Sequence, residues 1–295
     1  MSVLERPVII LGAPRSGTTL LGKLLSAHPD FAYAVEPRMV WRTGNDKRSD
    51  LLQPQHARPE VIRAIHQRFE STVKAHSRSR LLEKTPSNTL RVPFIEQVFS
   101  DAKYVHILRD GYESVLAIRQ FWATQARGLG VTKGRLRQRL GELSLRRLPY
   151  YAKEFARRSL PEPFARVFGQ NVWGPRLPGI DQMVKDLSPL EVSALQWRWC
   201  VELGCQDGRR LPRDRYMELR LDRLDAESLG RVAAFIEVDD ASPILDRYAK
   251  EFRPEQTRYR KAQADADDLR VLEKWIGPTC RWLEESHESL FGDAG

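Results

Sequence analysis

Cysteine is scarce in this sequence, and its three members, Cys200, Cys205 and Cys280, form no CxxC pair. That number and spacing argue against a disulfide framework and against a zinc site, and they suit a reducing compartment. Long apolar runs are absent as well. No stretch approaches the length of a signal-peptide core or a membrane span. We therefore expect a cytoplasmic protein.

Acidic residues are rare in one part of the chain. Between Arg127 and Arg158 there are ten Lys and Arg but only Glu142 and Glu154, a local charge of +8 in a protein whose formal charge is +9. No helix-turn-helix, zinc or RNP-like motif accompanies this cluster, so we expect no nucleic-acid partner. Two interpretations stay open. The segment is a solvated amphipathic insertion, or it is a lid or rim that attracts an anionic acceptor, an anionic cofactor or an acidic membrane surface.

The rest of the sequence predicts a globular α/β protein. Its 295 residues are 41% hydrophobic and 29% charged, which is ordinary for one large domain with a sizeable core. Helical patterns separate five short β-rich runs, which favours a parallel sheet of about five strands with helices on both faces. The predicted strands are Pro7–Leu11, Phe31–Val35, Arg80–Glu83, Lys103–Leu108 and Arg215–Leu219.

The sequence indicates one domain over residues 1–295, with an insertion at about 126–187 that we place near the site. After the insertion, Ser188 with Pro189 and Glu191 is typical of a capped helix start. The other predicted helices are Thr18–Ser26, Pro59–His76, Asn88–Phe99, Tyr112–Trp122, Glu227–Ile236 and Asp265–Glu285.

The loop after the first strand lacks the lysine of a nucleotide-kinase loop. In GxxxxGK[ST] a Lys follows the second Gly, whereas here Thr18 follows Gly17 and the basic residue is Arg15, inside the loop. A strand, a glycine loop and a helix start still form an anion site, because backbone N–H groups and the helix dipole converge there. The candidate ligand-binding residues are Pro14, Arg15, Ser16, Gly17, Thr18 and Thr19.

Charged side chains also follow three other strands. Glu36 comes directly after FAYAV and is a candidate general base, while Lys84 leaves the third strand and could neutralise charge. Arg109 follows the fourth strand, and Ser114 lies in the first turns of the next helix. His106 alternates with apolar residues inside the fourth strand, so we expect it to be a satisfied sheet residue. Ligands of parallel sheets bind at such carboxyl ends.

No acidic residue is placed as a magnesium-holding Walker-B Asp would be, which together with the missing lysine argues against ATP-driven phosphoryl transfer. A metal-assisted P-loop nucleotide kinase stays as an alternative. So does a non-catalytic nucleotide-binding module whose basic insertion docks on an acidic partner.

The sequence resembles the PAPS-dependent sulfotransferases, and most of all the branch that contains the protein-tyrosine sulfotransferases and related bacterial enzymes. PRSGTTLL at Pro14–Leu21 resembles the family's 5′-phosphosulfate loop, and YVHILRDGYESVLA resembles its 3′-phosphate segment. The AHPD sequence, Glu36, Arg38 and EKTPSN match further elements of that branch. The motifs cover about the first 125 residues.

The resemblance implies a P-loop-like fold and transfer of a sulfuryl group from PAPS, the donor substrate, to a hydroxyl acceptor. A sulfuryl group carries one negative charge, so the family needs neither a γ-phosphate lysine nor a metal ion. By resemblance, Arg15 holds the phosphosulfate, Glu36 is the base, Lys84 assists the leaving group, and Arg109 binds the 3′-phosphate.

The family has a Ser eight residues after the arginine that binds the 3′-phosphate, which is Arg109 in this sequence. Here that position is Ala117, and Ser114 is the candidate substitute. Arg258 and Arg260 are candidates for closing over the 3′-phosphate, and the charge pattern favours an acceptor with anionic character.

Overall fold

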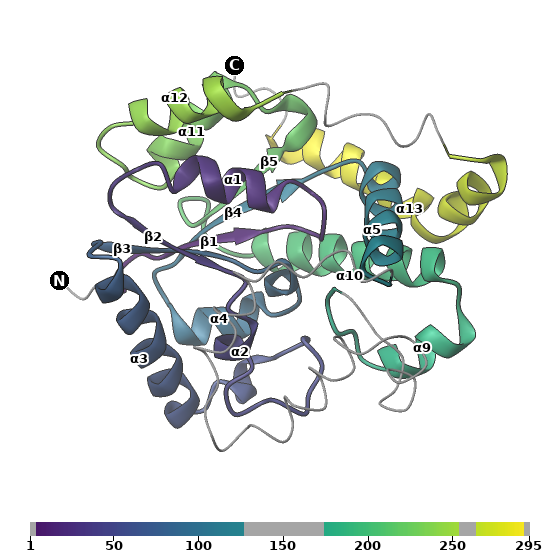
Figure 1. Ribbon diagram of the computed structural model, residues 1–295, viewed down its shortest axis with the longest axis horizontal. Coiled ribbons are helices and arrows are strands. Elements are labelled where there is room, and N and C mark those ends of the chain that lie inside the picture. Colours follow the sequence, from purple (N-terminus) through teal and green to yellow (C-terminus); the bar gives the residue numbers. More distant parts are fainter. Residues whose placement is uncertain (1–3, 127–173, 254–263, 292–295) are drawn as a thin grey trace.

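A computed structural model describes residues 4–126, 174–253 and 264–291. In this part of the chain, five strands form one all-parallel sheet in the order β2-β3-β1-β4-β5 (Figure 1). The prediction of a five-stranded parallel sheet is confirmed, with each boundary within one residue. The strands are β1 (Val8–Leu11), β2 (Phe31–Val35), β3 (Arg80–Lys84), β4 (Lys103–Leu108) and β5 (Tyr216–Arg220).

The central strands are apolar because helices cover both faces of the sheet. Every residue of β1 and of β4 is buried, which is the pattern of a parallel sheet with no solvated face. Alternate residues serve different layers. Ile9 and Leu11 pack with one set of helices, and Val8 and Ile10 pack with the other.

The helices form three groups around the sheet (Figure 1). The first group, with α1 (Thr18–Leu25), packs on the face of Val8 and Ile10. The second group, with α3 (Pro59–Ala75), packs on the opposite face. The third group surrounds α10 (Pro189–Gly208) in a separate apolar cluster. The first group also contains α11 (Ala226–Phe235) and α12 (Ser242–Glu251). The second group also contains α2 (Arg38–Trp41) and α4 (Val92–Val98). The third group also contains α5 (Gly111–Ala126), α9 (Ile180–Asp186) and α13 (Ala266–Phe291).

The predicted helix Asn88–Phe99 was wrong, because it is two elements. A 3₁₀ turn, η2 (Pro86–Leu90), precedes α4, and Arg91 between them has φ −145°. Pro93 explains the break. It has no N–H for the carbonyl of Thr89, but it is tolerated in the first turn of a new helix. Further short elements were not predicted, namely α2, α9, α12 and the 3₁₀ turns η1 (Pro54–His56) and η5 (Leu221–Arg223).

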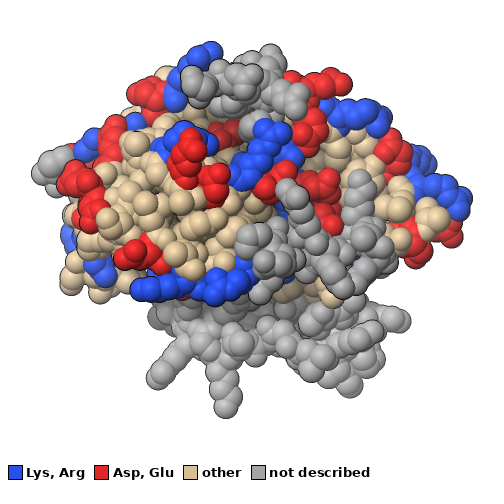
Figure 2. Space-filling view, turned by 90° about the horizontal axis from the view of Figure 1, so that it is seen from above, with Lys and Arg blue, Asp and Glu red and all other residues tan. Residues whose placement is uncertain are grey.

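The basic cluster from Arg127 to Arg158, and most of the predicted insertion, lie outside the described residues. The segment 174–179 is a loop, and α9 follows it. Seen from above, Lys and Arg side chains are interspersed with Asp and Glu on the described surface (Figure 2). None of the described helices is long and apolar enough to cross a bilayer.

The predicted cap of α10 is present and gives a test of the fold. The Glu191 N–H donates to Ser188 Oγ at 3.3 Å, and the Ser188 N–H donates to Glu191 Oε2 at 2.9 Å. We expect Ser188→Ala to lower the free energy of unfolding by about 1 kcal/mol, because it orphans a helix N–H group. Ser188→Thr is the control and should unfold like the parent in urea. Equal stability of the Ala variant would contradict the capping role.

Candidate active site

Four strand ends bring the predicted site residues to one edge of the sheet. The Pro14–Thr19 loop follows β1, Glu36 follows β2, Lys84 ends β3, and Arg109 follows β4. These four strands are neighbours and run parallel, so their carboxyl ends meet (Figure 1). The sheet therefore collects residues that lie far apart in sequence.

The loop after β1 has the shape of an anion cradle. Gly12 has φ 154°, and a Cβ there would lie 2.6 Å from Ser16 Oγ and 2.7 Å from the Ile107 carbonyl oxygen. Only glycine fits this close approach of backbone to backbone. Gly17 begins α1 at φ 98°, and no side chain caps that helix end. The first N–H groups of α1 are therefore available to an anion, with the positive end of the helix dipole behind them.

The side chains of the loop have different surroundings. The Ser16 hydroxyl donates to the Ala13 carbonyl at 2.7 Å, so Ser16 shapes the loop. Pro14 and Thr18 are buried, whereas Thr19 is exposed. Arg15 is exposed, has φ 68°, and its guanidinium lies 5.6 Å from the centre of the Phe121 ring. This cation–π contact was not predicted, because Phe121 lies on α5, more than a hundred residues away.

Glu36 and Lys84 form an ion pair that also touches the anion loop. Lys84 Nζ donates to Glu36 Oε1 at 2.8 Å and to Thr19 Oγ1 at 3.1 Å. The Lys84 side chain is 1% exposed and that of Glu36 is 33% exposed. Arg38 donates to the other carboxylate oxygen of Glu36 at 3.0 Å. A buried ammonium needs a counter-charge, and here this counter-charge is the predicted base.

Arg109 braces the loop from the fourth strand end. It donates to the Arg15 carbonyl at 2.9 Å and to the Glu113 carboxylate at 3.3 Å. Ser114, one residue further along α5, is completely buried, and its hydroxyl has no hydrogen-bond partner within the described part of the chain. A buried orphaned hydroxyl is unusual, and at a helix start beside an arginine it fits an anion.

Two buried arginines, Arg91 and Arg42, were not predicted; Arg91 interacts electrostatically with Arg42 and with Arg38. Arg91 is 1% exposed and lies 3.5 Å from Asp50. Burial lowers the pKa of Arg91, Asp50 opposes that shift, and the nearby charges of Arg42 and Arg38 lower it further. Arg91 Nη1 and Arg38 Nε are buried and donate no hydrogen bond to any described residue. The sequence signal that could have found Arg91 is an arginine placed between the apolar residues Leu90 and Val92.

Comparison with known proteins assigns the chain to a family. The sequence profile of the sulfotransferase family matches residues 7–172, which is more than half of the chain. This chain belongs to the sulfotransferase family. The matched part begins one residue before β1 and includes all four strand ends of the site.

The curated relatives are larger proteins. A stretch of 122 residues is 32% identical to protein-tyrosine sulfotransferase A of Caenorhabditis elegans, and covers 38% of this chain and 32% of that one. A stretch of 129 residues is 26% identical to the nodulation protein NoeE of Sinorhizobium fredii. It covers 38% of this chain and 31% of NoeE. The chain thus spans about a third of the length of these relatives.

A solved sulfotransferase shares the fold. The structure of STF9 from Mycobacterium avium aligns with 96% of this chain and 77% of its own, at a TM-score of 0.50 and 13% identity. At that identity the match supports the fold only. Two further candidates from the sequence of this sulfotransferase-family chain were expected to close over the 3′-phosphate. These residues, Arg258 and Arg260, lie outside the described residues.

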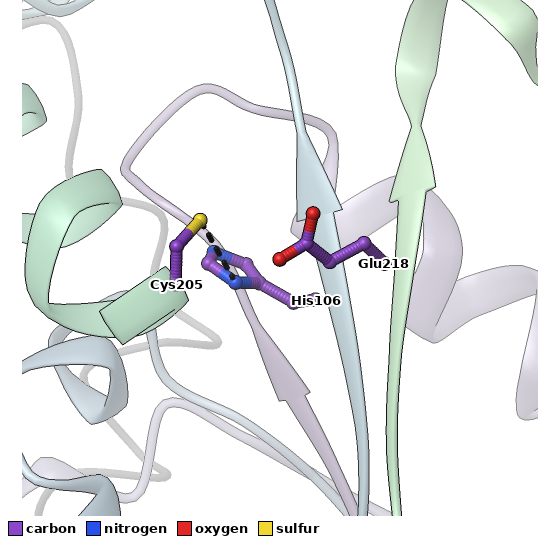
Figure 3. A group of neighbouring side chains, drawn as sticks. All are labelled: His106, Cys205 and Glu218. Atoms are coloured by element: carbon purple, nitrogen blue, oxygen red, sulfur yellow. Dashed lines mark hydrogen bonds between the residues drawn. The ribbon is translucent and has the colours of Figure 1, made fainter. Parts of the chain in front are cut away.

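One group of side chains has the composition of a metal site, but its bonding does not fit a metal. His106, Cys205 and Glu218 are buried with their ligand atoms within 4.8 Å of one another (Figure 3). Arg209 donates to both oxygens of Glu218, at 2.7 and 2.9 Å, and the Tyr216 hydroxyl donates to one of them at 2.8 Å. A cation would have to displace these donors and lie beside a guanidinium.

His106 is better described as a buried neutral residue. Its Nδ1 shares a 2.7 Å hydrogen bond with Tyr216, but Nε2 is buried and unpartnered in the described structure, so the prediction of a satisfied sheet residue holds for one ring nitrogen only. Burial lowers the pKa of His106 to about 4, and the charge of Arg209 adds to this shift although Glu218 opposes it. The folded protein therefore keeps this imidazole neutral at pH values where the unfolded chain protonates it.

This difference predicts a pH dependence of stability. The unfolded imidazole binds a proton below about pH 6.5 and the folded one only near pH 4, so stability is lost as the pH falls through that window, by about 3 kcal/mol. His106→Gln should unfold with a shallower pH dependence between pH 6.5 and 4. A parental slope in the His106 variant would contradict the buried neutral state.

Proposed function

We propose that this protein transfers the sulfuryl group of PAPS to a hydroxyl of an acceptor, leaving adenosine 3′,5′-bisphosphate. The family and the fold support this proposal, and so does one contact. Lys84 joins Glu36 to Thr19, so the candidate base lies beside the anion cradle in the folded protein. An acceptor hydroxyl at Glu36 is thereby within reach of a group bound in the loop.

The described residues fit a donor with two anionic ends. The cradle of Gly12, the uncapped start of α1 and Arg15 would hold the phosphosulfate. Arg109 and the orphaned hydroxyl of Ser114 would hold the 3′-phosphate. A phosphate there offers Arg109 a stronger partner than Glu113 and satisfies the Ser114 hydroxyl.

In the proposed reaction Glu36 accepts the proton of the acceptor hydroxyl. The acceptor oxygen forms a bond to sulfur while the bond from sulfur to the bridging oxygen breaks, and the electron pair leaves with the bisphosphate. Lys84 and Arg15 would stabilise the charge that develops on that oxygen. We also propose that the reaction needs no metal ion, since these fixed cations face a group with a single negative charge.

The acceptor that we propose has anionic character. Arg38 touches Glu36, and Arg91 is close enough for the charge of Arg38 to lower its pKa. Both keep a buried N–H group without a bond to a described residue. Of the two, Arg38 is the one that lies beside the base, so a carboxylate, sulfate or phosphate on the acceptor would find a cationic partner there. Whether the segment Arg127–Arg158 adds to this recognition, or contacts a membrane surface, stays a prediction about residues outside the described ones.

Two alternatives have distinct outcomes. Magnesium-dependent consumption of ATP would identify a P-loop kinase. Thermal stabilisation by adenosine 3′,5′-bisphosphate, with no transfer to any acceptor, would identify a nucleotide-binding module that docks on an acidic partner. The cytoplasmic location stays a prediction, and the three cysteines are free thiols in the structure.

Glu36→Gln tests the proposed base. It should lower kcat by at least about 100-fold, the usual contribution of a general base, in an assay of radiolabelled sulfate transfer. Affinity for adenosine 3′,5′-bisphosphate, measured by calorimetry, should stay within a few-fold of the parent because the cradle is intact. Glu227→Gln, at an exposed carboxylate on α11, is the control. Parental turnover in the Glu36→Gln variant would exclude Glu36 as the base.

Arg109→Ala tests the 3′-phosphate site. Loss of a charge-assisted contact should weaken the binding of adenosine 3′,5′-bisphosphate by about tenfold more than the binding of adenosine 5′-phosphate, which loses only the support that Arg109 gives to the loop. Arg119→Ala, which removes an arginine from the same helix where it pairs with Asp268, is the control and should alter neither affinity. Unchanged discrimination in the Arg109 variant would refute the assignment.

A further inference from the structure

A buried carboxylate lies directly behind the Glu36–Lys84 pair. Glu83 precedes Lys84 on β3, so its side chain points to the opposite face of the sheet, and it is completely buried. Three side chains donate hydrogen bonds to it. Trp41 Nε1 and Thr85 Oγ1 donate to Oε1 at 2.9 and 2.6 Å, and Asn88 Nδ2 donates to Oε2 at 2.5 Å.

These donors come from the two segments that carry the proposed chemistry. Trp41 ends α2, the helix that begins two residues after Glu36, while Thr85 and Asn88 follow Lys84 at the end of β3. Trp41 is itself fully buried, with Phe69 and Phe99 against its ring. One carboxylate thus connects the backbone after β2 to the backbone after β3, on the far side of the sheet from the ion pair.

The turn that carries Glu36 needs such support. Glu36 has φ 50°, the left-handed conformation that side-chain-bearing residues avoid. Its N–H donates to the Lys84 carbonyl at 2.8 Å, and Pro37 is then the N-cap residue of α2. A strained turn persists only where neighbouring structure fixes it, and α2 is the element that continues directly from this turn.

We propose that Glu83 is a positioning residue for the candidate base: through its hydrogen bond to Trp41 it fixes α2, and with it the strained turn that presents Glu36 to Lys84 and the anion loop. This inference rests on the proposed function for its effect on turnover, but its structural part can be measured without activity. Glu83 touches no substrate. It acts through Trp41, Thr85 and Asn88.

The hydrogen bonds, more than the negative charge, carry this role. Burial raises the pKa of Glu83 to about 7, and the hydrogen bonds from Thr85 and Trp41 together with the charges of Arg91 and Lys84 oppose that shift. Glutamine has the same shape and can accept from Trp41 and Thr85. Its Nε2 replaces the oxygen that accepts from Asn88 Nδ2, so the Asn88 amide must flip and accept through Oδ1, which is buried and has no partner among the described residues. Leucine fills the volume but leaves three buried donors unsatisfied.

The first experiment uses Trp41→Phe, which removes the indole donor and keeps an aromatic ring. Amide hydrogen exchange of residues 36–42 should become roughly tenfold faster, because the turn opens locally more often. The kcat for sulfuryl transfer should fall by roughly ten- to a hundredfold, while the affinity for adenosine 3′,5′-bisphosphate stays unchanged. The matched control is Tyr104→Phe, which removes another buried hydrogen bond from an aromatic residue to a carboxylate, 2.7 Å long, to Glu96.

The second experiment compares Glu83→Leu with Glu83→Gln. It tests the inference even if the Trp41→Phe variant fails to fold. The Leu variant should show the fast exchange and the low kcat, and the Gln variant should recover both to within about threefold of the parent, since it keeps the hydrogen bonds. Parental exchange in residues 36–42 of both Trp41→Phe and Glu83→Leu would overturn the inference. So would a Gln variant as impaired as the Leu variant, because the charge would then be decisive.

The outcomes separate this inference from the proposed function. If the parent protein transfers no sulfuryl group to any acceptor, the function fails. If Glu36→Gln retains turnover, only the role of Glu36 as the base fails. In both cases hydrogen exchange still decides whether Glu83 holds the turn. If Glu36→Gln is inactive but Trp41→Phe and Glu83→Leu both turn over at the parental rate, the function stands and the positioning role is wrong. A merely structural contribution would lower Tm in Trp41→Phe and Tyr104→Phe alike and leave kcat unchanged in both.

Discussion

The ion pair between Lys84 and Glu36 is the contact on which the organisation of this site depends. An ammonium buried to 1% exposure at the end of a central strand is costly unless an opposite charge satisfies it. Glu36 supplies that charge, and its own backbone must adopt a left-handed conformation to do so. The pair therefore links the ends of β2 and β3 electrostatically, and Thr19 extends the link to the loop after β1.

Several features of the site oppose stability locally, which is common where a protein prepares a binding surface in advance. Arg15 and Glu36 both have positive φ values without being glycine, and Ser114 is a buried hydroxyl with no partner in the described structure. The rigid sheet and its two covering layers make such strain tolerable, because the central strands are buried along their whole length. Bound anions would satisfy groups that the folded chain leaves unsatisfied.

The part of the chain beyond the family match adds the edge strand next to β4 and supports the same site from there. Strand β5 pairs with β4, and Leu221, just after it, approaches Gly17 so closely that a Cβ there would lie 3.0 Å from it. Helix α10 packs against α5 and α13 in the third apolar cluster and so supports the helix that carries Ser114. The anion loop is thus held by residues from both halves of the sequence.

The sequence by itself determined the strands, the parallel sheet, the cap at Ser188 and the strand-end placement of Arg15, Glu36, Lys84 and Arg109. These follow from local periodicity, turn chemistry and the rule that parallel strands end on one edge. Only the tertiary structure decided which partners these residues have. The hydrogen bond from Trp41 to Glu83, the contact of Arg15 with the Phe121 ring and the interaction between Arg38 and Arg91 join positions tens of residues apart or more. No local pattern encodes such contacts, because they depend on how the layers pack and on which buried polar groups must then satisfy one another.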